Sequence, residues 1–270
     1  MIQNIPPLLL IGGGKMGSAM LAGWLEQGAE QIAVIDPSPA AQSLAGAKVA
    51  VYVGLDQLPE DFRPQVLILA VKPQMADSVL PPYRKLASGA LAISIMAGKT
   101  IAALHGLLGP DAAIVRAMPN TPAAIRQGIT VATATGVSTE HRALATMLLA
   151  SVGEVAWVDD EALIDPVTAV SGSGPAYVFL LAECMEQAGI KQGLPPDLAR
   201  RLARQTVTGA GNLLAASAEA AAVLRQNVTS PGGTTAAALE ILNAVLPSAL
   251  DAAVAAAAAR SRELSAPGLK

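Results

Sequence analysis

A glycine-rich hexamer follows directly on the first apolar run of the chain. The run Leu8–Ile11 leads into Gly12–Gly17, which reads GGGKMG and matches the pattern G-x-G-x-x-G. In this pattern the first glycine allows a tight turn, the second lets a pyrophosphate approach the backbone, and the third lets a helix pack closely on the strand. Because a helical pattern over Met16–Gln27 follows, the hexamer predicts a dinucleotide-binding unit. Its candidate cofactor-binding residues are Gly12, Gly14, Lys15, Met16 and Gly17.

The first half of the chain alternates short aliphatic runs with helical patterns, as expected for a doubly wound parallel sheet of the Rossmann type. The first five runs are almost continuously apolar, which is typical of strands covered by helices on both faces. The predicted strands are Leu8–Gly12, Gln31–Asp36, Lys48–Tyr52, Val66–Val71, Leu91–Ala97, Ala113–Met118, Ile129–Ala134 and Val155–Asp159. The predicted helices include Met16–Gln27, Gln74–Leu86 and Thr100–Leu108.

After Asp160 the strand signals stop, and only helical patterns remain. The predicted helices of this second half are Glu161–Val170, Gly174–Gln187, Pro196–Ala216, Glu219–Gln226, Thr234–Val245 and Ser248–Ser265. We therefore expect an α/β dinucleotide-binding domain over residues 1–160 and an all-helical domain over residues 161–270.

Asp36 ends the second predicted strand, and an acid at this point usually bonds the ribose 2′-hydroxyl and repels a 2′-phosphate, which favours NADH over NADPH. A carboxylate that only caps the turn is the alternative, and Ser38 can donate to a phosphate, so both cofactors stay open.

The fourth predicted strand ends at the carboxyl edge of the sheet, where ligands bind in open α/β folds. Its candidate cofactor-binding residues are Ala70, Val71, Lys72 and Pro73, although Lys72 can equally be a solvated cap.

Composition narrows the classes of partner. The net charge is -3 and no basic cluster appears, so nucleic acid is not expected. The longest uncharged run, Pro166–Ala182, is interrupted by small and rigid residues, so no membrane span is expected either. The single cysteine, Cys184, excludes an internal disulfide and fits a reducing compartment, which predicts a cytoplasmic protein.

A polar segment in the second half predicts an anion site. Ser230–Thr235 reads SPGGTT and leads into the helix predicted from Thr234. Such a turn aims unpaired backbone N–H groups at one point, at the positive end of a helix. It is a cradle of the size of a carboxylate. A turn with only a structural role is the alternative.

Two further segments are unusually polar for so apolar a chain. Met118–Pro122 reads MPNTP, and Ser171–Tyr177 reads SGSGPAY. These two segments, the Gly-rich loop, the AVKP segment that ends at Pro73 and the cradle together resemble the pyrroline-5-carboxylate reductases. The resemblance covers almost the whole chain and keeps the order of the segments. Two departures are the Gly-Gly-Gly turn, where that family usually has Gly-Ala/Phe-Gly, and Asp36-Pro37, where members that use NADPH often place a polar residue and then arginine.

The resemblance implies a reductase that converts the cyclic imine 1-pyrroline-5-carboxylate into L-proline with NADPH or NADH. It implies that the second domain binds substrate, that its helices pair two subunits, that the cradle then lies against the cofactor groove, and that dimers can assemble further into a decamer. It also adds Ala97, Gly98 and Asn120 to the candidate cofactor-binding residues. The expected substrate-binding residues are Ser230, Gly232, Gly233, Thr234 and Thr235.

We assign the cradle to the substrate carboxylate and the Thr235 hydroxyl, as the candidate catalytic group, to the ring nitrogen. Catalysis by positioning requires neither a nucleophile nor a metal, and the sequence has no metal-ligand spacing, so no metal is expected. A reductase of another cyclic imine and a dinucleotide-binding protein without turnover remain alternatives. A β-hydroxyacid dehydrogenase is disfavoured, because the second half has no lysine in the motif of that class.

Overall fold

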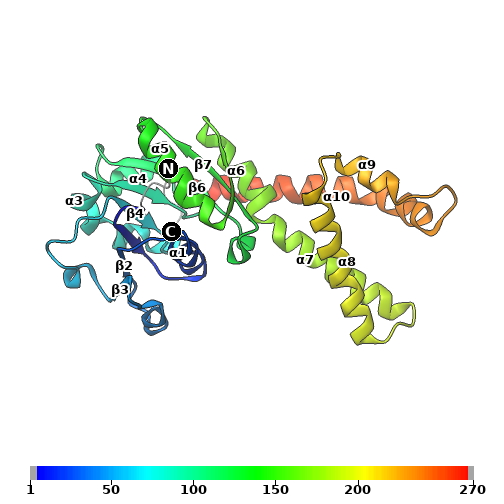
Figure 1. Ribbon diagram of the computed structural model, residues 1–270. Helices are drawn as coiled ribbons and strands as arrows, with labels where there is room; N and C mark the ends of the chain where they lie inside the picture. The colour runs from blue at the N-terminus through cyan, green and yellow to red at the C-terminus, as the bar shows by residue number, and fades with distance from the viewer. Residues whose placement is uncertain (1–4, 267–270) are drawn as a thin grey trace. The chain divides into compact units, whose positions relative to one another are not determined.

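The computed structural model describes residues 5–266, which divide into two compact units (Figure 1). One unit contains residues 5–172 together with 257–266, and the other contains residues 173–256. The outer limits of the two predicted domains, residues 1 and 270, lie outside the described residues. The last part of the predicted helical domain thus belongs to the first unit, and the boundary after residue 160 stays a prediction.

The first unit is built on one eight-stranded sheet of order β3-β2-β1-β4-β5-β6-β7-β8. Its strands are β1 (Leu8–Ile11), β2 (Ile32–Ile35), β3 (Val49–Tyr52), β4 (Val66–Leu69), β5 (Leu91–Ser94), β6 (Ala113–Met118), β7 (Gly128–Ala134) and β8 (Gly153–Trp157). All eight predicted strands are confirmed, with small shifts at their ends. The chain winds from β1 to β3 in one direction and from β4 to β6 in the other, so the doubly wound fold is confirmed and the topological switch lies between β1 and β4.

Strand β7 departs from the parallel arrangement. It pairs antiparallel with β6, and β8 pairs parallel with β7. The nine residues between β6 and β7 contain only a short 3-10 helix, Thr121–Ile125. A parallel connection needs a crossover of about a dozen residues or more, so this short link returns the chain antiparallel.

Helices cover both faces of the sheet (Figure 1). On one face α1 (Lys15–Glu26) and α5 (Thr139–Leu149) pack against strand residues such as Leu8 and Leu10. The Trp24 indole N–H donates to the carbonyl oxygen of Leu148 at 2.9 Å, which ties the two helices together. On the other face the helices between β4 and β6 pack against the alternate strand positions.

The predicted helix Gln74–Leu86 is wrong as a single element. The structure has a 3-10 turn at Pro73–Met75, α2 (Ala76–Val79), a second 3-10 turn at Pro81–Tyr83 and α3 (Arg84–Ala87). Pro81 and Pro82 lack backbone N–H groups, so a continuous helix would lose its hydrogen bonds there. The predicted helix after β5 is confirmed as α4 (Ile101–Leu108), and the Thr100 side chain caps its first turn.

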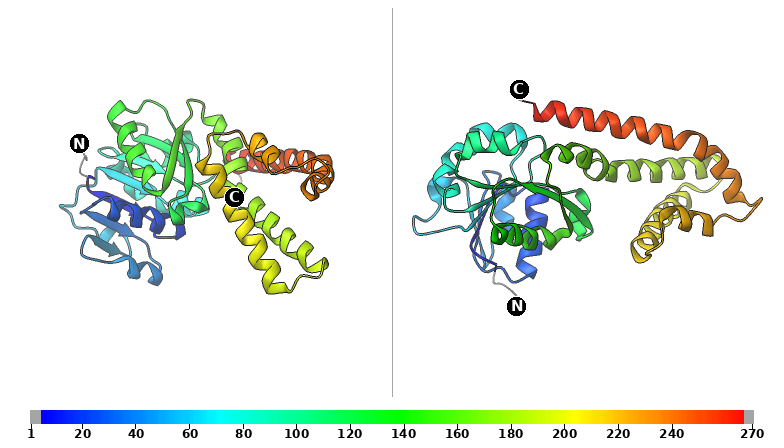
Figure 2. Two further views of the ribbon diagram at one scale, coloured as in Figure 1. Left: turned by 45° about the vertical axis from the view of Figure 1, so that its right-hand side comes forward. Right: turned by 90° about the horizontal axis from the view of Figure 1, so that it is seen from above.

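The remaining helices follow β8. They are α6 (Ile164–Val167), a π-helical turn at Thr168–Gly172, α7 (Gly174–Lys191), α8 (Pro196–Ala216), α9 (Ala221–Asn227) and α10 (Thr234–Ser265). Within the second unit, α7 and α8 pack side by side (Figure 2). The sequence predicted two helices where α10 is one, because the chain continues helically through Pro247.

By length and composition α10 is apolar enough to cross a membrane, although no span was expected from the sequence. Its most apolar 18-residue window has a mean hydropathy of 1.6, and only 6% of that window is buried. The other helices of residues 173–256 also expose large apolar side chains, such as Phe179, Leu180 and Leu213. An exposed apolar surface of this extent marks an interaction surface.

Candidate cofactor groove and carboxylate cradle

A cavity of about 940 Å³ lies at the carboxyl ends of the first four strands of the sheet. This position, at the topological switch of an open α/β sheet, is where such folds bind ligands. The cavity brings together these predicted cofactor-binding residues: Gly12, Gly14, Lys15, Asp36, Ser38, Ala70, Val71 and Lys72.

The glycines of the loop have the geometry of a dinucleotide cradle. Gly12 has φ of 101°, and a Cβ there would lie 2.7 Å from the backbone of Ala70. A Cβ on Gly17 would collide with the carbonyl oxygen of Gly12, so the third glycine allows α1 to pack against the loop. Gly14 has no atom within 4 Å of such a Cβ, which leaves open space where a pyrophosphate would approach the start of α1. These residues fit a dinucleotide.

Asp36 forms part of the loop structure as well as of the cavity. Its Oδ2 accepts a hydrogen bond from the backbone N–H of Gly13 at 2.6 Å, and its Oδ1 accepts one from the backbone N–H of Ser38 at 2.8 Å. The carboxylate therefore holds the glycine loop and its own turn together. Because each carboxylate oxygen has two lone pairs, capacity remains for a ribose hydroxyl.

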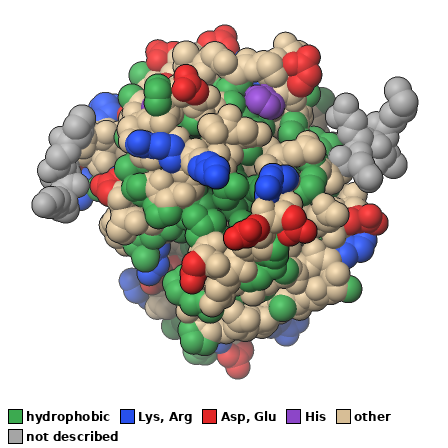
Figure 3. Space-filling model, turned by 90° about the vertical axis from the view of Figure 1, so that its left-hand side faces the viewer, with side chains coloured by type: hydrophobic (Ala, Val, Ile, Leu, Met, Phe, Trp, Pro, Cys, Tyr) green, Lys and Arg blue, Asp and Glu red, His purple; other side chains and the backbone are tan. Residues whose placement is uncertain are grey.

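Positive charge in the groove comes from lysines, since Lys15 and Lys72 line it and no arginine of the described chain does. The face drawn in Figure 3 shows basic, acidic and hydrophobic side chains interspersed among its described residues. A phosphate bound in the groove would meet these two lysines as well as the loop N–H groups and the start of α1.

Other predicted cofactor residues lie outside the cavity lining. Pro73 directly follows Lys72, whereas Met16 packs against the core on the α1 face. Asn120 uses its carboxamide oxygen to accept from the backbone N–H of Ile129 at 3.0 Å, which closes the short link between β6 and β7. The roles of these residues toward the cofactor stay predictions.

Ala97 and Gly98 form the turn after β5. Gly98 has φ of 72°, and a Cβ on it would lie 3.1 Å from the carbonyl oxygen of Leu264. Close by in the chain, Ser261 donates its hydroxyl to Asp165 Oδ1 at 2.6 Å. The last turns of α10 therefore pack on the first unit, and Gly98 is needed for this close approach.

An ion pair with one buried partner, in the first unit, was not predicted from the sequence. Arg116 of β6 is 3% exposed, and its guanidinium donates to Glu161 Oε1 at 2.8 Å. The same oxygen accepts from the backbone N–H of Ile101, at the start of α4, also at 2.8 Å. One carboxylate thus joins a strand, a helix start and the segment after β8. No spacing in the sequence signals a pair 45 residues apart.

The cradle in the second unit is a tight turn followed by a helix start. The backbone N–H of Gly233 donates to the carbonyl oxygen of Ser230 at 3.1 Å, and Gly232 has φ of 68°. Pro231 and Gly232 thus occupy the central positions that a type II turn favours. A Cβ on Gly233 would approach the Ser230 hydroxyl oxygen too closely, so a larger residue there would require the Ser230 side chain to rotate away.

Helix α10 begins directly after this turn. Its first hydrogen bond to the turn runs from Ala237 N–H to the carbonyl oxygen of Gly233 at 3.2 Å. The N–H groups of Thr234 and Thr235 precede it and have no partner within the helix. Thr235 is half-buried, whereas Ser230 and Thr234 are exposed. The turn therefore presents two N–H groups and neighbouring hydroxyls, which suits an anion.

Comparison with known proteins decides the family. A family model described as pyrroline-5-carboxylate reductase dimerisation matches residues 161–264, and one described as NADP oxidoreductase coenzyme F420-dependent matches residues 8–98. Pyrroline-5-carboxylate reductase from Pseudomonas aeruginosa is 41% identical over 97% of this chain and 98% of its own length. The enzyme of the same name from Haemophilus influenzae is 39% identical over 95% and 97%. The chain belongs to the pyrroline-5-carboxylate reductase family.

Solved structures of this family agree with the fold. A pyrroline-5-carboxylate reductase from Coxiella burnetii superposes with a TM-score of 0.90 at 34% identity, covering 97% of this chain and all of that one. The Plasmodium falciparum pyrroline carboxylate reductase, solved with NADP bound, gives 0.83 at 30% identity and covers 97% and 98%. The Rossmann-type sheet and helical second half are thus the fold of pyrroline-5-carboxylate reductases.

Proposed function

We propose that this protein reduces 1-pyrroline-5-carboxylate to L-proline, the last step of proline biosynthesis, with NADPH or NADH as hydride donor. The observation that carries the proposal is its identity of about 40% with pyrroline-5-carboxylate reductases over nearly the full length of both chains. The glycine loop and the cradle supply the two binding chemistries that this reaction needs.

The groove holds the cofactor through its own backbone and side chains. The loop Gly12–Gly17 and the start of α1 bind the pyrophosphate, and Asp36 accepts from the ribose. When bound, the reduced nicotinamide supplies the hydride for the imine carbon. The turn of Ala97 and Gly98 and the amide of Asn120 follow the neighbouring strands β5 and β6 and are assigned to the same cofactor.

The cradle holds and orients the substrate. The N–H groups and hydroxyls of Ser230–Thr235 bind its carboxylate, and the Thr235 hydroxyl hydrogen-bonds the ring nitrogen. A fixed carboxylate and a fixed nitrogen leave the imine carbon one orientation. Such positioning can lower the barrier by several kcal/mol without a nucleophile.

The protein acts as a homo-oligomer, and its apolar helices form the contact between subunits. The dimerisation model covers α7, α8, α9 and nearly all of α10. These helices expose the apolar side chains that a subunit interface would bury. We propose a dimer through these helices, in which the cradle meets a cofactor groove, and a decamer as a further assembly. A cytoplasmic location fits the free thiol of Cys184.

The test is the loss of reduced-nicotinamide absorbance in the presence of 1-pyrroline-5-carboxylate, run in parallel with NADPH and NADH. We expect turnover with at least one cofactor and formation of proline in equal amount. No turnover with either, in a protein that binds the cofactor, would contradict the proposal. Other cyclic imines bearing a carboxylate would then be the substrates to assay.

A further inference from the structure

The turn after β5 carries two of the proposed cofactor contacts, Ala97 and Gly98, and leads directly into α4. Gly98 lies close against the backbone of Leu264, which holds one side of the turn. The Ile101 N–H, at the start of α4, donates to Glu161 Oε1 at 2.8 Å. Segments that are distant in the sequence therefore fix both the turn and the helix start that follows it.

Among the polar contacts described for this turn, the one from Glu161 is backed by a buried charge. Lys99 also pairs with Asp77 Oδ1 at 2.7 Å, but the Asp77 side chain is 71% exposed and such pairs contribute little. Glu161 Oε1 receives instead the Arg116 guanidinium at 2.8 Å, in a charge-assisted hydrogen bond. Because the same oxygen accepts from Arg116 and from Ile101, the carboxylate cannot shift without losing one of them.

The sheet in turn fixes Arg116. This residue pairs in register with Ser94, the last residue of β5, from which the turn starts. It also lies two residues before Met118, the end of β6, and thus near the carboxyl edge of the sheet. The buried guanidinium therefore gives Glu161 a rigid reference point beside the turn.

The turn lies on the side of the sheet that the nicotinamide half of a dinucleotide reaches. The glycine loop follows β1 and Asp36 follows β2, and in such folds these two hold the pyrophosphate and the adenosine ribose. Strand β5 lies beyond the topological switch between β1 and β4. A dinucleotide that crosses the switch from Asp36 therefore brings its nicotinamide towards the turn after β5.

We propose that Glu161 is a positioning residue for hydride transfer, because its carboxylate, held by Arg116, fixes the start of α4 and with it the turn of Ala97 and Gly98. The inference rests on the proposed use of NADPH or NADH. In this role Glu161 acts through the turn and contacts neither cofactor nor substrate. Its loss should therefore affect hydride transfer more than binding of the adenosine half, which the glycine loop holds.

The double variant Arg116→Met with Glu161→Leu separates positioning from stability. Apolar side chains in place of the ion pair should recover stability, whereas the N–H of Ile101 still lacks its acceptor. In Glu161→Ala we expect kcat at saturating NADPH or NADH to fall about 10- to 100-fold, the effect of a displacement of up to about 1 Å. In the double variant kcat should stay low although the melting temperature rises again.

Glu161→Gln is the conservative variant, since its carboxamide oxygen can still accept from the N–H of Ile101. It should recover most of the kcat that Glu161→Ala loses. Inhibition by 5′-AMP measures binding of the adenosine half alone, and its inhibition constant should keep the wild-type value in all three variants.

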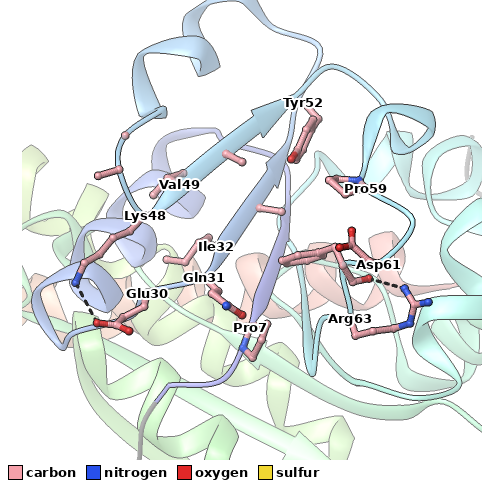
Figure 4. A pocket seen from close by; sticks show the side chains of 15 residues that line it. Pro7, Glu30, Gln31, Ile32, Lys48, Val49, Tyr52, Pro59, Asp61 and Arg63 are labelled. Carbon is pink, nitrogen blue, oxygen red and sulfur yellow. Dashed lines mark hydrogen bonds and ion pairs between the residues drawn. The ribbon is translucent and has the colours of Figure 1, made fainter.

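Hydrogen exchange provides a measurement on the protein without cofactor. The amides at the start of α4 should exchange faster in Glu161→Ala and in the double variant than in the wild type and Glu161→Gln. Glu30→Ala is the matched control, because Figure 4 shows Glu30 in another ion pair of the same unit, with Lys48 at 3.8 Å beside a cavity of about 550 Å³. It should leave kcat and the exchange at α4 unchanged.

Five outcomes would overturn the proposal. They are an unchanged kcat in Glu161→Ala, a kcat that recovers with the melting temperature in the double variant, no gain in Glu161→Gln over Glu161→Ala, a loss of 5′-AMP binding in proportion to kcat, and wild-type exchange at α4 in Glu161→Ala. The failure of the proposed function is distinguishable, because wild-type protein would then not turn over 1-pyrroline-5-carboxylate, whereas exchange would still report whether Glu161 fixes α4.

Discussion

The backbone N–H of Gly13 donates to the carboxylate of Asp36 at 2.6 Å, across 23 residues of sequence. The glycine loop and the end of β2 are thus joined by a charge-assisted hydrogen bond, a class that is stronger than a neutral one. The loop structure depends on this carboxylate, which we also propose to contact the ribose of the cofactor, so a substitution of Asp36 is expected to have two separable effects.

Asp36→Ser should shift preference toward NADPH. Loss of the negative charge removes repulsion of the 2′-phosphate, by about 1 kcal/mol in a partly exposed site, so the ratio of kcat/KM for NADPH to that for NADH should rise roughly fivefold. Both constants should also fall, because Gly13 loses its charged acceptor. Steady-state kinetics with both cofactors measure the ratio. An unchanged ratio would mean that Asp36 serves only the loop.

Thr235→Ala should weaken transition-state binding. Loss of one polar contact to the substrate costs about 1–3 kcal/mol, which lowers kcat/KM roughly 5- to 150-fold. Thr135→Ala, at an exposed position in the turn after β7, is the control and should keep wild-type kinetics. Equal kinetics in both variants would remove Thr235 from the site.

Phe179→Asp should dissociate the oligomer. Phe179 is 67% exposed on α7, within residues that the dimerisation model matches, and a charge in a buried subunit contact is costly. Analytical ultracentrifugation should detect a smaller species and a matching loss of activity. Ile125→Asp is the matched control, since Ile125 is 69% exposed but lies outside the matched residues. A wild-type sedimentation coefficient for Phe179→Asp would place the contact elsewhere.

Glu161→Ala should destabilise the fold. It leaves the guanidinium of Arg116, with a side chain only 4% exposed, without its partner and removes the acceptor of Ile101 N–H. Removal of one partner of a buried pair costs about 3–5 kcal/mol of unfolding free energy. Because Glu161 is partly exposed, we expect a loss of about 3 kcal/mol, at the lower end of this range. Urea denaturation measures it. The double variant Arg116→Met with Glu161→Leu should recover part of the loss, and a double variant no more stable than Glu161→Ala would argue against a coupled pair.

Tyr83 should make stability fall at alkaline pH. Burial raises the pKa of Tyr83 from its ordinary value of 10.0 to about 12 in the folded protein. Between these two pH values the folded state therefore keeps the phenol proton, whereas the unfolded state releases it. Its contribution is therefore complete below pH 10 and is lost as the pH rises through 12. The wild type should lose about 2 kcal/mol more than Tyr83→Phe over this interval, as measured by urea denaturation at each pH. Parallel pH profiles would contradict the burial of this phenol.

The sequence predicts the parts of the fold that local pattern controls. Each strand is a short apolar run, and the glycine hexamer, Asp36 and the AVKP segment lie at strand ends, so topology brings them to one edge. The Gln74–Leu86 helix is wrong because two adjacent prolines outweigh the helical pattern. The prediction of two helices in place of α10 is wrong for the opposite reason. Strong helix formers lie on both sides of Pro247, and the helix continues through this proline.

The rest of the site depends on contacts that leave no local pattern. Tyr83 follows Pro82 with no spacing that signals a cavity, and only the folded structure brings it and Leu55 to the same cavity lining. The contact of Arg116 with Glu161 likewise requires the completed sheet. A glycine loop is recognisable from sequence because its chemistry is in the backbone, whereas the rest of the cavity lining is made by side chains from distant segments.

The hydrogen bond between Asp165 and Ser261 sets a late point for the folding of the first unit during synthesis. Ninety-six residues separate the two, and Ser261 belongs to the segment that returns to the cofactor-binding unit after the other unit has been passed. The first unit is therefore completed only by residues that are translated after the whole of the other unit. A chain without the residues from Ala257 on would lack the contact of Leu264 with Gly98 and the hydrogen bond from Ser261 to Asp165, so this surface of the first unit would stay uncovered until they are added.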